Sequence, residues 1–193
     1  ISMVPKSEHV KAVYSEFLEV LSPGKLLIDM STIDPYTSRE LSKQVKEKRC
    51  FMIDAPVVKS KPAAIAGELG IYVGGDKQAF ERAKGILSCM GKNIIYMGEN
   101  GTGLVMKICH NMLVSQIQNG VNETVTLAGK SGLNFDDVIT AISYGGGQNF
   151  YLDGKKDAIK NHDFTTAFSV ENMDKDINIE IGRASCRERV YGE

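Results

Sequence analysis

The sequence predicts an α/β fold, in which a largely parallel sheet occupies about the first hundred residues and an all-α part follows. Up to Gly98, short apolar runs alternate with amphipathic stretches of helical spacing. This alternation is typical of strands and helices that follow one another along a parallel sheet. After Gly98 the strand-like runs stop, and the segment 101–132 has the length and spacing of one long helix. We expect the first part to span residues 1–100 and the second to span 101–180.

The individual elements follow from the same patterns. Five apolar runs are expected to be strands, at 1–4, 25–31, 51–57, 69–75 and 93–98. Amphipathic helices are expected at 9–21, 35–49 and 76–91, with Pro35 at a helix start and Asp76 as an N-cap. Beyond the long helix we expect helices at 134–143, 148–161 and 169–181, the first capped by Asn134 or Asp136.

Composition limits the possible classes of function. The chain has 193 residues, 42% hydrophobic and 24% charged, which is ordinary for a soluble globular protein. The net charge of -1 gives no broad electrostatic case for nucleic acid or an anionic membrane. No run approaches the roughly 20 apolar residues that span a bilayer. The four cysteines form no CxxC pair, so we expect reduced thiols, a cytoplasmic protein and no metal site.

One stretch of the long predicted helix has an unusual distribution of charge. Residues 108–122 include no Asp, Glu, Lys or Arg, and a single lysine, Lys107, stands directly before them. Lys107 and Asn111 are four residues apart, so they share one helical face. A lysine at a domain surface explains this pattern, and a polar stripe that lines a cleft explains it too.

Hydroxyl and amine groups gather where two expected strands end. Ser31 and Thr32 stand at the end of the second strand, and Lys59, Ser60 and Lys61 form a loop after the third. The carboxyl ends of parallel strands are where α/β sheets bind ligands. A capping box or turn before the helix at Pro35 is an alternative for the first pair, although capping alone explains only one hydroxyl. An ordinary solvated turn is the alternative for the second group.

The glycines before the long helix do not form a phosphate-binding loop. Leu104 follows Gly103 where a P-loop requires a lysine, and the spacing does not match GxGxxG. We expect Gly101 and Gly103 to allow a close approach of the backbone to another helix or to a ligand.

Three motifs give the chain a resemblance to a known family. They are DMSTIDP at 29–35, DAPV at 54–57 followed by AGELGIYVGG at 66–75, and GTGLVMKICHNML at 101–113. Their order and spacing resemble those of the β-hydroxyacid dehydrogenases, such as 3-hydroxyisobutyrate dehydrogenase, tartronate semialdehyde reductase and sulfolactaldehyde reductase. The resemblance covers the chain from Ile1 to about Ile181.

The resemblance implies the C-terminal part of a Rossmann-like parallel sheet domain, joined by a long helix to an all-α domain, with NAD or NADP as the cofactor. Lys107 matches the family's catalytic lysine, and Asn111 matches the asparagine one turn later. The cofactor contacts that the resemblance implies are Val4, Pro5, Thr32 and Lys175. Ser31 is implied to lie at the substrate.

At one place the chain departs from the family pattern. Relatives commonly carry Ser-Gly-Gly after DAPV to hold the substrate carboxylate, whereas Val58, Lys59 and Ser60 stand here. Sulfolactaldehyde reductases are similar in having a basic residue near this place that holds a sulfonate. We therefore expect Lys59 and Ser60 to bind an anionic end of the substrate and Lys61 to face solvent.

The resemblance implies an oxidoreductase that transfers a hydride between nicotinamide and a small anionic 3-hydroxy acid or its semialdehyde, in a homo-oligomeric parent protein. One alternative is a decarboxylating enzyme similar to 6-phosphogluconate dehydrogenase. Another is a non-catalytic relative that binds a nucleotide or metabolite.

Both ends of the chain suggest a fragment. The family's glycine-rich nucleotide loop would precede Ile1, so we expect the chain by itself to bind cofactor poorly and to be inactive. The end, EIGRASCRERVYGE, can be back-translated into a sequencing adapter, so we expect 181–193 to be non-native.

Overall fold

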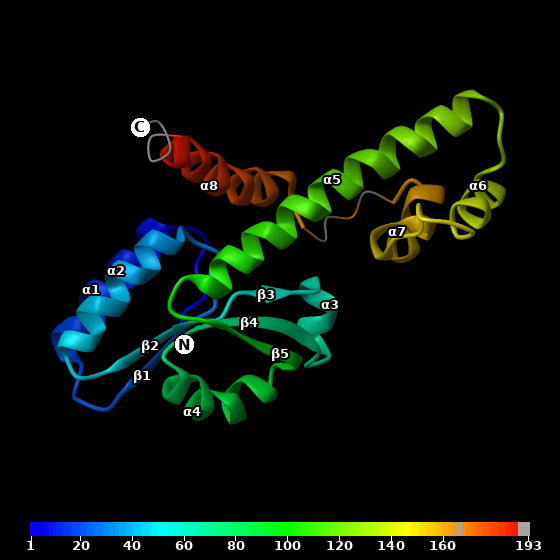
Figure 1. The fold of residues 1–193 in the computed structure, drawn as a ribbon. Coiled ribbons are helices and arrows are strands. Elements are labelled where there is room, and N and C mark those ends of the chain that lie inside the picture. Colours follow the sequence, from blue (N-terminus) through cyan, green and yellow to red (C-terminus); the bar gives the residue numbers. More distant parts are fainter. Residues whose placement is uncertain (164, 166–167, 189–193) are drawn as a thin grey trace. The chain divides into compact units, whose positions relative to one another are not determined.

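The computed structural model describes residues 1–163, 165 and 168–188, with the backbone alone for 180–188. The chain forms two compact units, the first made of Ile1–Cys109 together with helix α8 (Val170–Glu188) and the second of His110–Ser169. Figure 1 shows the long helix α5 (Thr102–Lys130), which begins in the first unit and continues into the second. The first unit contains the sheet.

Five strands form the sheet, and the two longest pairings are parallel. Strand β1 (Leu26–Asp29) pairs in parallel with β2 (Phe51–Asp54), and β4 (Leu69–Gly75) pairs in parallel with β5 (Gly91–Gly98). Strand β4 also pairs antiparallel with β2 and with the two-residue strand β3 (Val57–Val58). The expected α/β class is confirmed, although the centre of the sheet is mixed.

Three details of the sequence prediction are corrected. The strand expected at 1–4 is reduced to a single parallel bridge between Ser2 and Asp29. The strand expected at 51–57 is divided into β2 and β3. The loop expected around Ser60 and Lys61 is the start of a short helix, α3 (Ser60–Ile65), which the short local pattern did not reveal.

Helices cover both faces of the sheet, as Figure 1 shows. Helices α1 (Ser7–Val20) and α2 (Pro35–Glu47) pack on one face and α4 (Lys77–Ser88) packs on the other. Alternate strand residues point to opposite faces. Leu27 accordingly belongs to the core under α1 and α2, whereas Ile28 belongs to the core under α4.

Two helix caps fix how the chain leaves the strands. The side chain of Asp34 accepts hydrogen bonds from the backbone N–H groups of Tyr36 and Thr37, with Pro35 in the first turn of α2. Asp76 accepts from Gln78 and Ala79 at the start of α4, which confirms the expected N-cap. Such caps satisfy amides that have no partner inside the helix.

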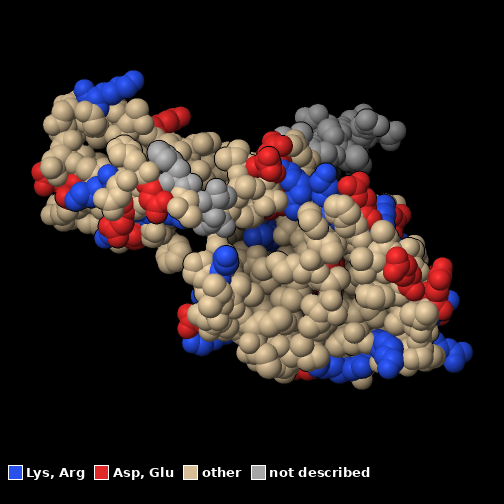
Figure 2. Space-filling view, turned by 180° about the vertical axis from the view of Figure 1, so that it is seen from behind, with Lys and Arg blue, Asp and Glu red and all other residues tan. Residues whose placement is uncertain are grey.

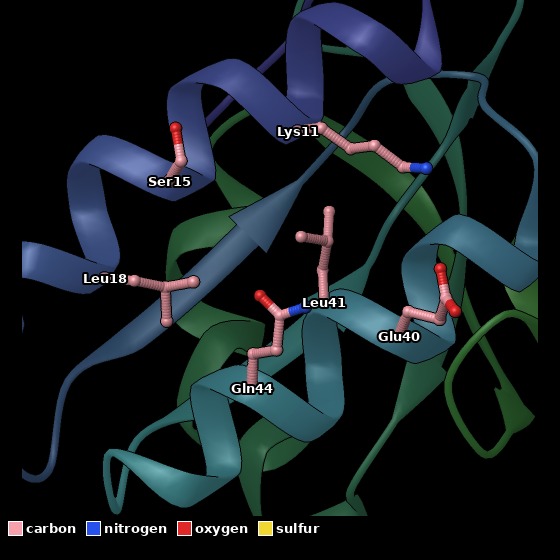
Figure 3. Close-up of a pocket in the computed structure, with 6 residues that line it drawn as sticks. All are labelled: Lys11, Ser15, Leu18, Glu40, Leu41 and Gln44. Atoms are coloured by element: carbon pink, nitrogen blue, oxygen red, sulfur yellow. The ribbon is translucent and has the colours of Figure 1, made fainter.

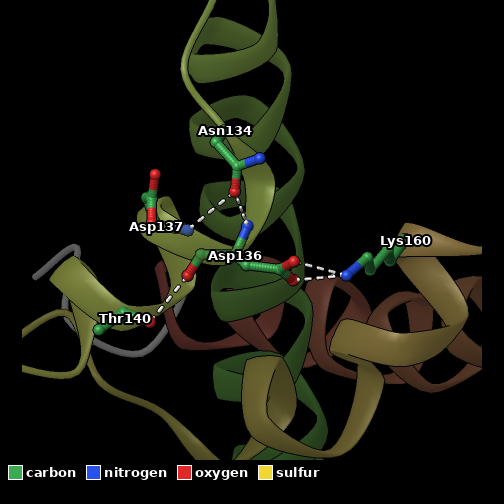
Figure 4. A network of polar contacts seen from close by, with 5 residues as sticks. All are labelled: Asn134, Asp136, Asp137, Thr140 and Lys160. Atoms are coloured by element: carbon green, nitrogen blue, oxygen red, sulfur yellow. Dashed lines mark hydrogen bonds and ion pairs between the residues drawn. The ribbon is translucent and has the colours of Figure 1, made fainter.

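The second unit contains the rest of α5 with helices α6 (Phe135–Ile142) and α7 (Phe150–Lys160). The Asn134 side chain caps α6 through the backbone N–H groups of Asp136 and Asp137, as expected. Figure 4 shows that the Lys160 ammonium of α7 reaches the Asp136 carboxylate of α6, at 2.6 Å. This exposed ion pair connects the two short helices.

Charged side chains of both signs are interspersed on the face that Figure 2 shows. This agrees with the net charge of -1. Within the described residues, no helix combines the length and the apolar character needed to cross a bilayer.

The start of α5 approaches the end of β4 very closely. A Cβ atom at Gly103 would lie 2.5 Å from the Tyr72 carbonyl oxygen and 2.9 Å from Asp54 Oδ2. The close approach expected at Gly103 is present, but its partner is the sheet and not another helix.

We predict that Gly103→Ala lowers the free energy of unfolding by about 1–3 kcal/mol, because the added methyl group overpacks this contact. Gly85→Ala is the matched control, since nothing lies within 4 Å of a Cβ atom at this position in α4. It should raise the free energy of unfolding by up to about 1 kcal/mol, because alanine favours a helix over glycine. Urea unfolding of both variants measures this, and equal effects would contradict the prediction.

Candidate active site

A buried polar network lies where β1 ends. Asp29 Oδ1 accepts hydrogen bonds from the hydroxyls of Ser2 at 2.9 Å and Ser31 at 2.7 Å. The Ser31 hydroxyl in turn accepts from the backbone N–H of Val4 at 2.9 Å. Ser31 and Val4, which the sequence assigned to substrate and cofactor, are thus brought together. The Ser31 hydroxyl donates to Asp29 and accepts from Val4, so it connects the backbone of Val4 to the end of β1.

Lys175 of α8 connects the two loops that carry the expected cofactor contacts. Its ammonium donates to the backbone carbonyl oxygens of Pro5 at 3.0 Å and Thr32 at 2.9 Å. It also forms an ion pair at 3.1 Å with Asp176, which is buried. The structure therefore places Pro5, Thr32 and Lys175 at one point beside the carboxyl end of β1.

Lys107 lies in the second turn of α5, and its side chain is buried. Burial lowers the pKa of Lys107 to about 8, because removal from water disfavours the ammonium. The nearby carboxylate of Asp176 opposes this effect, and the positive charge of Lys175 adds to it. The lysine is not a solvated surface group, so the first of the two interpretations of its helical face is wrong for this residue.

Asn111 follows Lys107 by one turn of α5 and is the first predicted site residue of the second unit. Its side chain is buried, and its Oδ1 lies 3.1 Å from His110 Nδ1. The helix thus presents the lysine and the amide one turn apart, as the four-residue spacing requires.

Lys59 and Ser60 occupy an unusual backbone conformation. Their φ angles are 85° and 64°, in the left-handed region that glycine adopts most easily. The family's two glycines fall at these positions, so the turn keeps a glycine-like conformation without glycine. Both side chains are exposed. Within the described residues, no hydrogen bond or ion pair connects either side chain to Lys107.

Three buried carboxylates, Asp29, Asp54 and Asp176, were not identified as site residues from the sequence. Asp29 and Asp54 end the apolar runs LLID and FMID, and an acidic residue that closes a buried strand is a recognisable signal. Asp176 follows Lys175 directly but resembles an ordinary charged helix residue. Burial raises the pKa of Asp29, although hydrogen bonds from Ser31 and Ser2 oppose this.

A groove of about 270 Å³ lies between α1 and α2 (Figure 3). Its lining residues are Lys11, Ser15, Leu18, Glu40, Leu41 and Gln44. None of them belongs to the set that the sequence singled out, and both signs of charge are present. This groove therefore adds nothing to the candidate site.

The buried ammonium should cost stability. The pKa of Lys107 falls from 10.5 to about 8 on folding, which corresponds to about 3 kcal/mol of destabilisation below pH 8. This cost disappears as the pH rises from 8 to 10.5, where the unfolded chain also loses the proton.

We predict that Lys107→Met raises the free energy of unfolding by up to about 3 kcal/mol at pH 7, and that the gain shrinks toward zero near pH 10. Urea unfolding at several pH values measures it. Lys130→Met is the control, because Lys130 is an exposed lysine of the same helix, and its effect should stay within about 0.5 kcal/mol. A gain for Lys107→Met that does not vary with pH would contradict the prediction.

Comparison with known proteins identifies both parts of the chain. Residues 1–98 match the family model of the NAD binding domain of 6-phosphogluconate dehydrogenase. Residues 101–186 match the model of the NAD-binding domain of NADP-dependent 3-hydroxyisobutyrate dehydrogenase.

Individual relatives agree with these models. An NAD-dependent L-serine dehydrogenase of Pseudomonas aeruginosa is 31% identical over 100% of this chain and 68% of its own length. A probable mitochondrial 3-hydroxyisobutyrate dehydrogenase of Dictyostelium discoideum is 42% identical over 69% of this chain and 43% of its own length.

A solved structure shows the same fold over nearly the whole chain. It is the 3-hydroxyisobutyrate dehydrogenase of Mycobacterium tuberculosis with L-serine, at a TM-score of 0.89 and 29% identity. The match covers 96% of this chain and 66% of that one. The chain thus spans from under half to about two thirds of these relatives. With both family models matched in order, the chain belongs to the β-hydroxyacid dehydrogenase family.

Proposed function

We propose that this chain is part of an NAD(P)-dependent oxidoreductase that acts on a small 3-hydroxy acid or the corresponding semialdehyde. The observation that carries the proposal is the buried Lys107 ammonium near the Lys175–Asp176 pair. A lysine whose pKa is about 8 is partly neutral near physiological pH, so it can both give and take a proton.

The residues beside the carboxyl end of β1 fit the nicotinamide end of a dinucleotide. Backbone carbonyl groups of Pro5 and Thr32 meet the ammonium of Lys175 there, at the kind of strand end where such sheets bind nucleotides. Val4, Pro5, Thr32 and Lys175 would hold the cofactor. When bound, the nicotinamide supplies or accepts the hydride.

Lys107 has the chemistry of the acid–base group. In reduction, its ammonium donates a proton from Nζ to the substrate carbonyl oxygen as negative charge develops there. In oxidation, the neutral amine accepts the proton of the substrate hydroxyl. Asp176 prevents the pKa of Lys107 from falling further, and Asn111 would hold the substrate or orient the amine.

Two relatives support a small 3-hydroxy acid as the substrate. The Pseudomonas relative is an L-serine dehydrogenase, and the Mycobacterium structure contains L-serine, which is itself a 3-hydroxy acid. We propose that Lys59 and Ser60 bind the anionic end of the substrate, as a carboxylate or a sulfonate. Their exposure and the glycine-like turn support this role.

A decarboxylating reaction is the second candidate, because the model matched by residues 1–98 takes its name from 6-phosphogluconate dehydrogenase. Release of carbon dioxide with the reduced cofactor would identify it. The Dictyostelium relative is mitochondrial, so a cytoplasmic location stays a prediction. A homo-oligomeric full-length protein stays a prediction as well.

Turnover tests the role of Lys107. In a full-length enzyme that carries these residues, we predict that Lys107→Ala lowers kcat by at least about 100-fold, because positioned proton transfer contributes 10²–10⁴ to the rate. Binding of NADH, measured by fluorescence, should change little. Lys130→Ala, at the exposed end of α5, is the control. Retained turnover would disprove the assigned role.

Substrate charge tests the role of Lys59. We predict that Lys59→Gly lowers kcat/KM about 10- to 100-fold for aldehydes with an anionic end group, because a charge-assisted hydrogen bond is lost. Neutral aldehydes should be affected little, since glycine adopts the φ of 85° without strain. Lys61→Ala is the neighbouring control. An equal loss on both classes of aldehyde would count against this substrate contact.

A further inference from the structure

The last residue of β2 is joined to the first turn of α5 by its carboxylate. Asp54 is fully buried, and its Oδ1 accepts a hydrogen bond from the backbone N–H of Gly101 at 2.6 Å. Its Oδ2 accepts from the backbone N–H of Leu104 at 3.0 Å. Amides at the start of a helix have no carbonyl partner inside the helix. One side chain therefore binds the end of the sheet to the start of the helix.

The space around this carboxylate is filled. A Cβ atom at Gly74 would lie 2.7 Å and 2.8 Å from the two carboxylate oxygens of Asp54. A Cβ atom at Gly103 would lie 2.9 Å from Asp54 Oδ2. The carboxylate is held between β4 and the helix, so the first turn of α5 has little freedom to shift while both hydrogen bonds exist.

A second set of contacts fixes Asn100, two residues before the helix begins. The Asn100 side chain donates to the Met52 carbonyl at 2.9 Å and accepts from the Ser42 hydroxyl at 2.8 Å. Its backbone carbonyl accepts from Arg39 Nε at 3.0 Å. The entry to α5 is thus attached to both β2 and α2.

Lys107 is three residues beyond Leu104 on the same helix, about 4.5 Å along the helix axis. A change in the first turn therefore moves the lysine directly. We infer that Asp54 is a positioning residue for Lys107, which it holds in the buried site through the first turn of α5. The effect of Asp54 on catalysis rests on the proposed function. Its effect on the position of Lys107 does not.

The ionisation of Asp54 supports this role. Burial raises the pKa of Asp54 to about 6, and the hydrogen bonds from Gly101 and Leu104 only partly oppose it. At neutral pH the side chain is therefore a carboxylate in an environment that disfavours charge. Asparagine has the same size and would avoid this cost, but its single oxygen would have to serve both amides.

The test uses Asp54→Asn in the present chain, with amide hydrogen exchange and the NMR titration of Lys107 Cε as readouts. We expect exchange at Gly101 or Leu104 to become at least tenfold faster. We also expect the pKa of Lys107 to rise from about 8 toward 10.5, because a displaced side chain gains contact with water. Asp76→Asn is the control, since the Asp76 carboxylate also accepts hydrogen bonds from two backbone amides at the start of a helix, α4, and it should leave the pKa of Lys107 unchanged.

The direction of the pKa change distinguishes displacement from a direct effect of charge. Loss of a nearby carboxylate without movement would lower the pKa of Lys107, because the ammonium would lose an attraction. An unchanged or lower pKa, or unchanged amide exchange, would overturn the inference.

If Asp54→Asn does not fold, the unmodified chain is titrated from pH 4.5 to 7.5. The amide resonances of Gly101 and Leu104 and the Cε resonance of Lys107 should then shift with one midpoint. A Lys107 resonance that stays constant while the amides titrate would overturn the inference. None of these measurements uses turnover, so they test the positioning of Lys107 even if the proposed enzymatic function is wrong.

Discussion

The attachment of α5 to the sheet through the Asp54 carboxylate is the contact on which the rest of the site depends. Helix α5 carries Lys107 and Asn111, and its first turn is fixed where β2 ends. The same strand end lies beside Asp29 at the end of β1, because Asp29 and Asp54 are paired in the parallel register. The position of Lys107, the proposed acid–base group, thus depends on the end of the sheet beside which the expected cofactor contacts lie.

Burial of the Asp54 carboxylate and of the Lys107 ammonium lowers the free energy of unfolding. The pKa of Asp54 rises from 3.8 to about 6, which corresponds to about 3 kcal/mol lost above pH 6 and regained as the pH falls toward 4. Burial of the Lys107 ammonium lowers the free energy of unfolding by a similar amount. Here the loss is present below pH 8 and disappears as the pH rises, because burial disfavours the charged form. Apolar clusters on the two faces of the sheet offset these costs. Buried charges whose pKa values shift toward the neutral form are characteristic of functional sites.

Much of the fold could be predicted from the sequence, because the periodicity of apolar residues determines helices and strands locally. The caps at Asp76 and Asn134 and the long helix α5 were predicted from such local signals. The short helix α3 and the antiparallel pairing of β3 with β4 were missed, because neither has enough residues to show a period.

The candidate site was predictable in part. Lys107 and Asn111 could be assigned through a motif, because all its residues are adjacent in the sequence. The left-handed turn at Lys59 and Ser60 could not be predicted from these two residue types, since neither favours a positive φ, and only the glycines of the relatives at these positions point to it. The role of Asp54 could not be foreseen either, because its partners lie 47 and 50 residues away.

Helix α8 belongs to the unit that contains the sheet, which brings Lys175 and Asp176 to the same unit as Lys107. The sequence pattern groups residues 101–180 as the all-α part, whereas the contacts place α8 in the same unit as the sheet. Lys175 reaches Pro5 and Thr32, which precede it by 170 and 143 residues. Because Asp176 and Lys175 both act on the charge of Lys107, the groups that control its proton lie within one compact unit.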